Sequence, residues 1–285
     1  MTLIEPLVAG RALQADVEAA DPGDGLVFWW LGQSGFLVKS AAGRVLLDPY
    51  LSDSLSRKYE HTDKPHVRMT ALAIAPSELH SIDVVTSSHS HSDHLDAETL
   101  DAVFRSNPAA AFVVPAANRA FVADRLHCDP AWPRGLTDGE SLSVDNITIH
   151  AIPAAHNEID RDEQGRCRCL GYVVQLSGMT VFHSGDTLRY PDMAELLRHF
   201  AVDVALLPIN GNRPQRRVAG NLAGDEAAEL AHDIGARLVV PCHYDMFEFN
   251  TESPDLFVET CRRLKQPYKV LRCGERLSIG PASSN

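Results

Sequence analysis

Four potential metal ligands lie within six positions of residues 87–96, "SSHSHSDHLD". They are His89, His91, Asp93 and His94, and imidazole and carboxylate groups bind borderline and hard divalent metals. In an extended segment, residues two apart point the same way, so His89 and His91 can reach one metal together. Asp93 continues that spacing, whereas His94 faces elsewhere and suits a second metal. A single His-x-His would be an ordinary solvated loop, but the whole pattern predicts a metal site.

Three later residues extend this set of ligands. His156 follows "AIPAA", Asp186 lies in "FHSGDT" and His243 lies in "VVPCHYD". The glycine before Asp186 permits a tight turn that would aim the carboxylate. With these three residues the chain offers seven ligands, which is enough for two metals that share one carboxylate.

The elements that must position these side chains alternate along the chain. Short apolar runs bounded by turn residues predict strands, and segments with a helical spacing of apolar residues predict helices. The expected strands are 26–31, 36–38, 44–47, 82–86, 110–115, 146–156, 171–176, 179–186, 202–209, 237–245 and strands within 268–279. The expected helices are 96–106 with Asp96 as N-cap, 116–127, 193–200, 224–236 and 253–265, and residues 51–70 are expected to form a long loop.

The predicted ligands follow the ends of predicted strands. His94, His156, Asp186 and His243 each come just after such an end. Strand ends that converge on one edge of a sheet are where such folds place chemistry. This pattern, without a low-complexity linker, predicts one domain with two halves, each a sheet covered by helices.

Composition limits the possible partners. The 285 residues are 45% hydrophobic and 22% charged, with a formal net charge of -12, which argues against binding to a nucleic-acid polymer. A small anionic substrate held by local arginines stays possible. No apolar run reaches the roughly 20 residues of a membrane span, and the N-terminal segment has no basic region typical of a signal peptide. Six scattered cysteines fit reduced thiols, so we expect a cytoplasmic protein.

The motif "HSHSDH", followed in order by His156, Asp186 and His243, resembles the metallo-β-lactamase superfamily. The resemblance implies an α/β fold, an αββα sandwich of two mixed sheets flanked by helices, formed by residues 26–285. Residues 1–25 would be an extension packed on or near it. The resemblance also implies a first metal bound by three histidines, a second bound by one aspartate and two histidines, and a bridging aspartate: His89, His91 and His156; Asp93, His94 and His243; and Asp186.

Longer stretches are similar to the L-ascorbate-6-phosphate lactonase group. They are "WLGQSGFLV", "LLDPYLSDS", "LLPINGNRPQRR", "GNLAGDEAAELAHDIGA" and "VVPCHYDMFEFN". This resemblance implies a cytoplasmic homo-oligomer that uses two divalent ions, Mn²⁺ or Zn²⁺. We expect the chain to diverge from that group in the loops 51–70 and 157–169.

The expected activity is opening of a lactone in a phosphorylated sugar-like substrate. Two metals can hold a bridging water and lower its pKa from 15.7 toward about 7, and the resulting hydroxide would attack the carbonyl. Asp93 and Asp186 are the expected catalytic carboxylates. The alternative is a phosphodiesterase acting on small molecules or cyclic nucleotides. A third hypothesis, a non-catalytic scaffold, is opposed by the complete ligand set.

Substrate contacts are predicted near the same strand ends. Adjacent Arg216 and Arg217 can clamp a phosphate, although a solvated loop pair is the alternative. Asn210 and Tyr244 are expected to line the pocket. His183 is either a group that supports the ligands or shuttles a proton, or a structural histidine.

Overall fold

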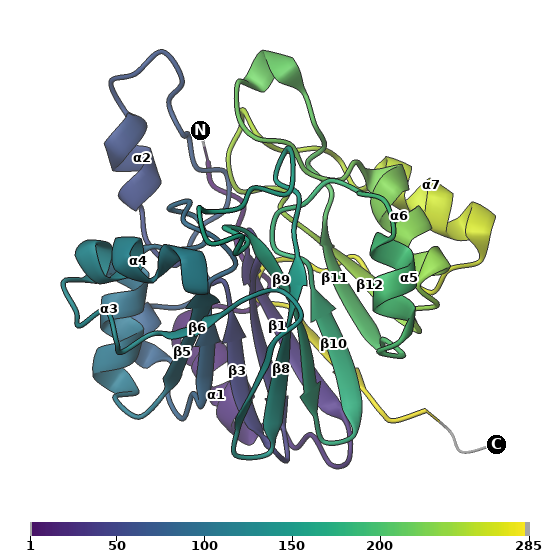
Figure 1. The fold of residues 1–285 in the computed structure, drawn as a ribbon, viewed down its shortest axis with the longest axis horizontal. Coiled ribbons are helices and arrows are strands. Elements are labelled where there is room, and N and C mark those ends of the chain that lie inside the picture. Colours follow the sequence, from purple (N-terminus) through teal and green to yellow (C-terminus); the bar gives the residue numbers. More distant parts are fainter. Residues whose placement is uncertain (1, 283–285) are drawn as a thin grey trace.

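Two β-sheets face each other in the computed structural model, which describes residues 2–282 (Figure 1). The first sheet has the order β13-β1-β2-β3-β4-β5-β6 and the second has the order β12-β11-β10-β9-β8-β7. The strands of the first sheet are β1 Leu26–Gly32, β2 Gly35–Ser40, β3 Gly43–Leu47, β4 Val84–Thr86, β5 Ala111–Pro115, β6 Arg134–Leu136 and β13 Arg276–Ile279. Those of the second are β7 Ser141–Val144, β8 Ile147–Pro153, β9 Leu170–Leu176, β10 Met179–His183, β11 Val204–Pro208 and β12 Leu238–Cys242.

Helices cover the outer face of each sheet. Figure 1 shows α1, α3 and α4 on the side of the first sheet, and α5, α6 and α7 on the side of the second. The helices are α1 Gly10–Ala19, α2 Ser54–Tyr59, α3 Ala97–Ser106, α4 Arg119–Leu126, α5 Met193–Arg198, α6 Gly224–Asp233 and α7 Asp255–Leu264, with 3-10 turns η1 Pro76–Glu78, η2 Ala116–Asn118 and η3 Pro214–Arg216. The predicted α/β sandwich of two mixed sheets flanked by helices is therefore confirmed.

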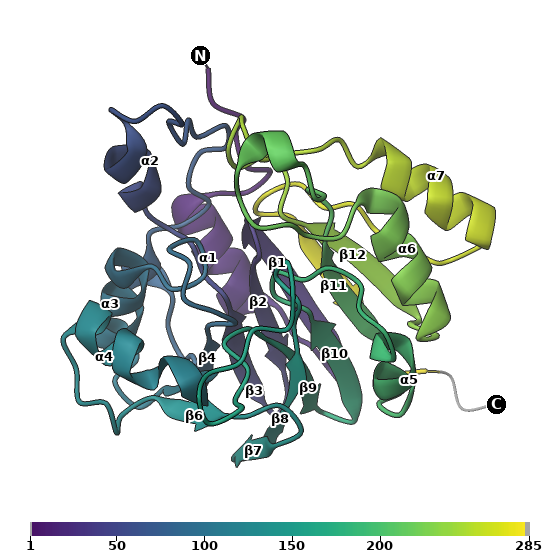
Figure 2. The ribbon, with the colours of Figure 1, turned by 45° about the horizontal axis from the view of Figure 1, so that its top comes forward.

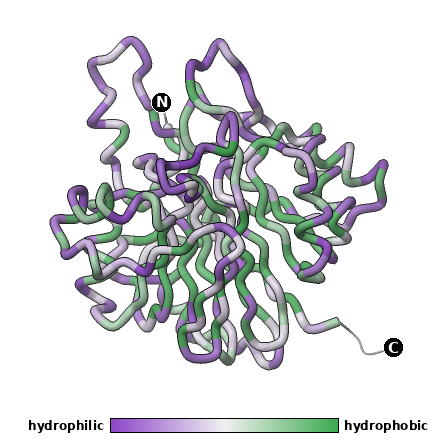
Figure 3. The backbone as a smooth tube through the Cα atoms, in the orientation of Figure 1, coloured by the Kyte–Doolittle hydropathy of each residue, from purple (hydrophilic) through white to green (hydrophobic). Residues whose placement is uncertain are grey.

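The core lies between the sheets and under the helices. All of β1 is buried, and in β8 Ile147, Ile149 and Ala151 alternate with less buried residues, as the spacing predicts. Figure 3 shows hydrophobic residues following the central strands, whereas the loops above them are hydrophilic. The N-terminal segment joins this core, because α1 buries Leu13 and Val17. None of the helices in residues 2–282 combines the length and hydrophobicity that a membrane span requires.

Two expected segments differ from the prediction. Residues 51–70 were expected to lack a helix, but they contain α2, a single short helix whose Leu55 packs with Tyr50, Met246 and Phe247. Two of these partners, Met246 and Phe247, come from a distant part of the chain, so local spacing did not indicate a helix. Within 268–279 only β13 is a named strand, and it pairs antiparallel with β1.

The topology brings the predicted ligands to one edge. Strands β3 to β6 are parallel to one another, and so are β10 to β12. Strand β8 runs in the same direction as β10 because both pair antiparallel with β9. The carboxyl ends of β4, β8, β10 and β12 are followed by the ligand-bearing loops, which meet between α2 and the η3 loop (Figure 2).

Candidate metal centre

All seven predicted ligands lie together at this edge. Their ligand atoms fall into three overlapping groups within 4.8 Å, which are His89, His91 and His156; His89, His94 and Asp186; and Asp93, His94 and His243. The first and third groups coincide with the two ligand sets implied by the sequence. The middle group joins them through Asp186.

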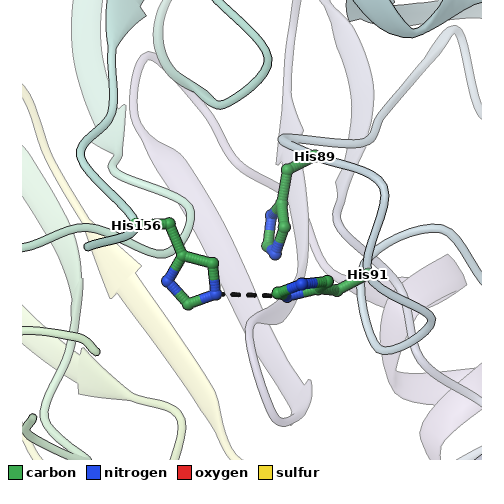
Figure 4. A group of neighbouring side chains, drawn as sticks. All are labelled: His89, His91 and His156. Carbon is green, nitrogen blue, oxygen red and sulfur yellow. Dashed lines mark hydrogen bonds between the residues drawn. The ribbon is translucent and has the colours of Figure 1, made fainter. Parts of the chain in front are cut away.

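The first group is formed by three imidazole rings that converge from two loops (Figure 4). His156 Nε2 and His91 Nδ1 are 3.1 Å apart, and the ring centroids of His89 and His91 are 4.6 Å apart. His156 Nδ1 bonds the carbonyl of Gly220 at 3.0 Å. That bond requires the proton on Nδ1, so Nε2 keeps its lone pair toward the other rings.

Asp186 lies between the first and second groups. Its Oδ1 is 3.2 Å from His94 Nε2, while its Oδ2 is 3.3 Å from His243 Nε2 and 3.7 Å from His156 Nε2. Asp93 Oδ2 is 3.6 Å from His243 Nε2 and 3.7 Å from His94 Nε2. Asp186 is thus the carboxylate that lies between the two groups of ligand atoms.

A buried network fixes the orientation of two of these rings. Asp48, at the end of β3, accepts a bond from His94 Nδ1 at 2.8 Å and another from the Ser88 hydroxyl. Because the single Ser88 hydroxyl proton goes to Asp48, Ser88 Oγ accepts from His89 Nδ1 at 3.0 Å. Both rings therefore present Nε2 to the shared space. Such outer contacts set the tautomer and basicity of metal-ligating histidines.

The donor atoms fit a divalent metal pair. With the His94 proton on Nδ1, where Asp48 accepts it, the buried atoms His89 Nε2, His94 Nε2 and Asp186 Oδ1 have no hydrogen-bond partner among the described residues. Buried polar atoms are rarely left unpaired, because that costs about 1–3 kcal/mol each. Cations between the two groups would satisfy these atoms, and the nitrogen and oxygen donor set is suitable for Zn²⁺ or Mn²⁺.

Electrostatics divides the histidines into two classes. Burial, together with the neighbouring His94 and His91, holds the pKa of His89 well below its usual value. Burial would also lower the pKa of His94 and His243, but Asp186 and Asp93 outweigh it. They raise the pKa of His94 well above its usual value and that of His243 to about 9. Protons on these two rings can balance the carboxylates when no metal does.

A cavity of about 480 Å³ opens over the ligands. Its walls add aromatic side chains and three cationic residues, Lys58, Arg125 and Arg217. The residues that line it without belonging to the predicted ligands are Leu55, Lys58, Tyr59, His66, Ser90, Ser92, Phe121, Arg125, Arg217, Val218, Ala219, Phe247, Phe249 and Asn250. Among them, the ring of His66 stacks on that of Tyr59 with 4.1 Å between centroids.

The four predicted substrate contacts, Asn210, Arg216, Arg217 and Tyr244, differ in their position relative to the cavity. Arg217 lines the cavity and pairs with Asp63 at 2.8 Å. Arg216 instead donates to the carbonyl of Thr251 at 2.8 Å and pairs with Glu252, so its guanidinium is occupied by protein groups.

Asn210 and Tyr244 are buried and are not among the described residues that line the cavity. Asn210 is 0% exposed and donates to Asn250 Oδ1 at 3.0 Å. The Tyr244 hydroxyl donates to the carbonyl of Leu271. These side chains are committed to protein partners, which leaves Arg217 as the member of the predicted set at the cavity.

His183 is buried behind the ligands. Its Nε2 bonds the carbonyl of Ser34 at 2.9 Å, and its Nδ1 accepts the amide of Gly185 at 3.3 Å. Both contacts hold the chain that carries Asp186. This geometry matches the structural alternative considered for His183.

Three residues at the site were missed in the sequence. Asp48 could have been found as an aspartate that directly follows a strand, in "LLDPY". Gln33 contacts Asp93 and His243, and Arg125 Nη1 donates to the carbonyls of Ser90 and Leu95, which holds the ligand loop. No local signal distinguishes either residue, because their contacts are long-range.

Comparison with known proteins gives the same architecture. Residues 43–244 match the family model of the β-lactamase superfamily domain. A UPF0173 metal-dependent hydrolase of Pelotomaculum thermopropionicum is 28% identical over 255 residues, 88% of this chain and 98% of that protein. One of Thermococcus kodakarensis is 28% identical over 254 residues, again 88% and 98%. Among solved structures, the metallo hydrolase Igni18 of Ignicoccus hospitalis superimposes with a TM-score of 0.65 at 21% identity, covering 90% of this chain and 99% of that one.

Proposed function

Because the chain belongs to the metallo-β-lactamase superfamily, we propose that it is a metal-dependent hydrolase. One observation carries the proposal. Seven histidine and aspartate side chains converge from four loops, and buried donor atoms among them lack partners in the described part of the chain. The names of the hydrolases that it resembles agree with this activity.

In the proposed reaction, the candidate ligands form two ion-binding sets joined by one aspartate. His89, His91 and His156 would hold one ion, Asp93, His94 and His243 the other, and Asp186 would lie between them. A bound divalent pair would acidify a water and polarise the electrophilic oxygen of the substrate.

The protein's own groups orient this centre. Asp48 and Ser88 keep the imidazole lone pairs of His89 and His94 directed inward. Asp93, which is partly exposed to the cavity, is the carboxylate that can accept a proton from a water or orient it.

For the substrate we propose a small anionic ester, with the lactone of a phosphorylated sugar-like molecule as the first candidate. Support comes from the cations at the cavity of an otherwise acidic chain of net charge -12. Arg217 can release Asp63 and bind an anion of the substrate instead, because the side chains of Arg217 and Asp63 are 61% and 76% exposed. An exposed pair of this kind contributes little to stability, so the exchange costs little.

A phosphodiesterase for small molecules or cyclic nucleotides is the second candidate, and the aromatic wall favours it. His66 lies with its ring centroid 4.1 Å from Tyr59 and 4.4 Å from Phe249, in a cluster that lines the cavity. Aromatic rings can stack on a planar base, whereas a sugar phosphate makes less use of them. A cytoplasmic location, assembly into a homo-oligomer and the use of Mn²⁺ or Zn²⁺ stand as further proposals.

A substrate screen tests the activity. Metal-loaded protein would be offered a phosphorylated sugar lactone, its unphosphorylated parent and a cyclic nucleotide, with metal-stripped protein as the control. We expect hydrolysis of one class that requires metal. Failure on all three after full metal loading would contradict the proposed substrates.

The bridging role of Asp186 supplies a matched variant for that screen. Asp186→Ala removes the carboxylate that lies within 3.7 Å of His94, His156 and His243. We expect loss of hydrolysis and lower occupancy of at least one ion, with the far-ultraviolet circular dichroism unchanged. Near wild-type turnover with two ions bound would exclude the bridging role.

A further inference from the structure

Gln33 lies in the tight turn between β1 and β2, and its side chain points into the second group of ligands. The side chain is buried, with 1% of the residue exposed. Its Nε2 is 2.8 Å from Asp93 Oδ2 and 3.0 Å from His243 Nε2. Gln33 belongs to none of the predicted ligand sets, yet its amide touches two of their members.

The backbone holds Gln33 in this place. Its carbonyl accepts the amide of His243 at 3.0 Å and the Trp30 indole at 2.9 Å. Both Gln33 and His243 adopt positive φ angles, 51° and 62°, which non-glycine residues rarely do. The hydrogen bond between the two backbones holds both residues in these unusual conformations. As a result, the side chains of Gln33 and His243 meet in the second group of ligands.

The spacing of the amide matches a position in a coordination shell. Ligand atoms about 2.0–2.2 Å from one metal, at angles from about 90° to 109°, lie about 2.8–3.6 Å from one another. The facing atom of Gln33 lies 2.8 Å and 3.0 Å from two predicted ligand atoms. His91 and His156 of the first group are similarly spaced, at 3.1 Å.

The other end of the amide has no partner. Gln33 Oε1 is buried and accepts no hydrogen bond from the described residues. The oxygen and nitrogen of a primary amide have similar shapes, so a rotation of about 180° about the last side-chain bond exchanges them. That rotation would break the contacts of Nε2 with Asp93 and His243 but no bond made by Oε1.

A cation in the second group would reverse the preferred orientation. It would bind Nε2 of His243, which then could no longer contact the amide nitrogen of Gln33, and it would repel the positive hydrogens of that nitrogen. The amide oxygen is a suitable ligand for hard divalent ions. We propose that Gln33 rotates its amide on metal loading and becomes a further ligand of the second ion, beside Asp93, His94 and His243.

This inference rests on the two-metal centre proposed above and adds to it the identity of one ligand. Metal-stripped full-length protein would be titrated with Zn²⁺ in competition with a chelator, to give a dissociation constant for each ion. The variants are Gln33→Leu, which removes the amide, and Gln33→Glu, which keeps an oxygen but cannot donate. Gln175→Leu is the control, because the side chain of Gln175 is exposed and bonds His150 on the neighbouring strand β8, away from the site.

The ligand role and a simple donor role predict different results. If Gln33 is a ligand, Gln33→Leu should weaken binding of the second ion about 10- to 100-fold and leave the affinity for the first ion unchanged. Gln33→Glu should bind the second ion at least as tightly as the wild type does. If Gln33 only donates to Asp93, Gln33→Glu should lose the second ion as Gln33→Leu does, and the inference is overturned.

Other outcomes also decide the question. Wild-type affinities for both ions in Gln33→Leu would overturn the inference while leaving the two-metal centre intact. Uptake of a single ion by the wild-type protein would overturn both. Should Gln33→Leu not fold, retention of the second ion by Gln33→Glu supports the ligand role and its loss opposes it.

Discussion

The inward-facing nitrogens of His89, His94 and His156 are each oriented by a hydrogen bond made at the other side of the ring. Asp48 accepts a hydrogen bond from Nδ1 of His94 and, through the Ser88 hydroxyl, also orients His89. The carboxylate is fully buried, and although burial alone would raise its pKa, the contact with His94 holds that pKa below the usual value. Asp48 therefore stays charged at neutral pH and acts as a fixed anion behind the metal ligands.

We expect Asp48→Asn to weaken binding of the ion held by His94 about 10- to 100-fold, because the uncharged amide no longer fixes or polarises the ring. Chelator competition on the purified protein measures this change. Asp83→Asn serves as a control, since the Asp83 carboxylate accepts the backbone amide of Arg44 at 2.8 Å and precedes β4, at the end of that strand away from the ligand loop. Unchanged affinity in Asp48→Asn would show that ring orientation is set by packing instead.

Substitution of the two adjacent arginines should have different effects, one on substrate binding and one on stability. If Arg217 binds a phosphate, Arg217→Ala should lower kcat/KM about ten- to a hundredfold for a phosphorylated substrate and little for its neutral parent. Arg216→Ala should lower the free energy of unfolding, because Arg216 holds Thr251 and Glu252. Equal losses on both substrates in Arg217→Ala would assign that residue a structural role.

At the scale of elements, α3 begins directly after the ligand loop and fixes its end. Asp96 is the N-cap, as predicted, and accepts the amide of Thr99 at 3.1 Å. It also accepts the hydroxyl of Ser54 at 2.8 Å, which ties the start of α2 to the start of α3. One buried carboxylate thus links the ligand loop to the helix beside the cavity.

We expect Asp96→Ala to destabilise the protein by about 1–2 kcal/mol, since it removes a cap and leaves buried donors unpaired. Urea denaturation of the metal-free protein measures the free energy of unfolding. Asp101→Ala on the exposed face of the same helix is the matched control. Equal stability of the two variants would contradict the cap's role.

At the scale of the whole molecule, loops from the two sheets bring the carboxylates of Asp93 and Asp186 close together, and their negative charge must be balanced. Without metal, His94 and His243 can balance it by keeping protons, because Asp186 and Asp93 raise their pKa values against the effect of burial. A raised histidine pKa stabilises the fold fully below the ordinary value of about 6.5, and this contribution is lost as pH rises through the folded-state pKa.

The free energy of unfolding of metal-free protein should therefore fall as pH rises from about 6.5 to about 9, the upper limit being the pKa of His243. Each unit of pKa difference corresponds to about 1.4 kcal/mol. Metal-loaded protein should lose less over this range, because ions replace the protons. Urea denaturation at both pH values checks this, with His243→Ala as a comparison, and a flat profile in the metal-free protein would contradict it.

The sequence by itself predicted the candidate ligands, most strands and helices, and the order in which they occur. Ligand type and spacing are local properties, visible in "HSHSDH", and the period of apolar residues is local as well. This is why the helix capped by Asp96 and the alternation along 147–151 were predicted correctly.

Only the tertiary structure decided which groups surround those ligands. Asp48 and Gln33 lie 46 and 60 positions from the His94 and Asp93 that they contact, so no window of sequence relates them. The same holds for Arg216 and Arg217, neighbours in sequence whose side chains separate because Arg217 has a positive φ of 52° and turns toward the cavity. A contact made by the packing of two sheets is a property of their arrangement, and residue types alone do not specify it.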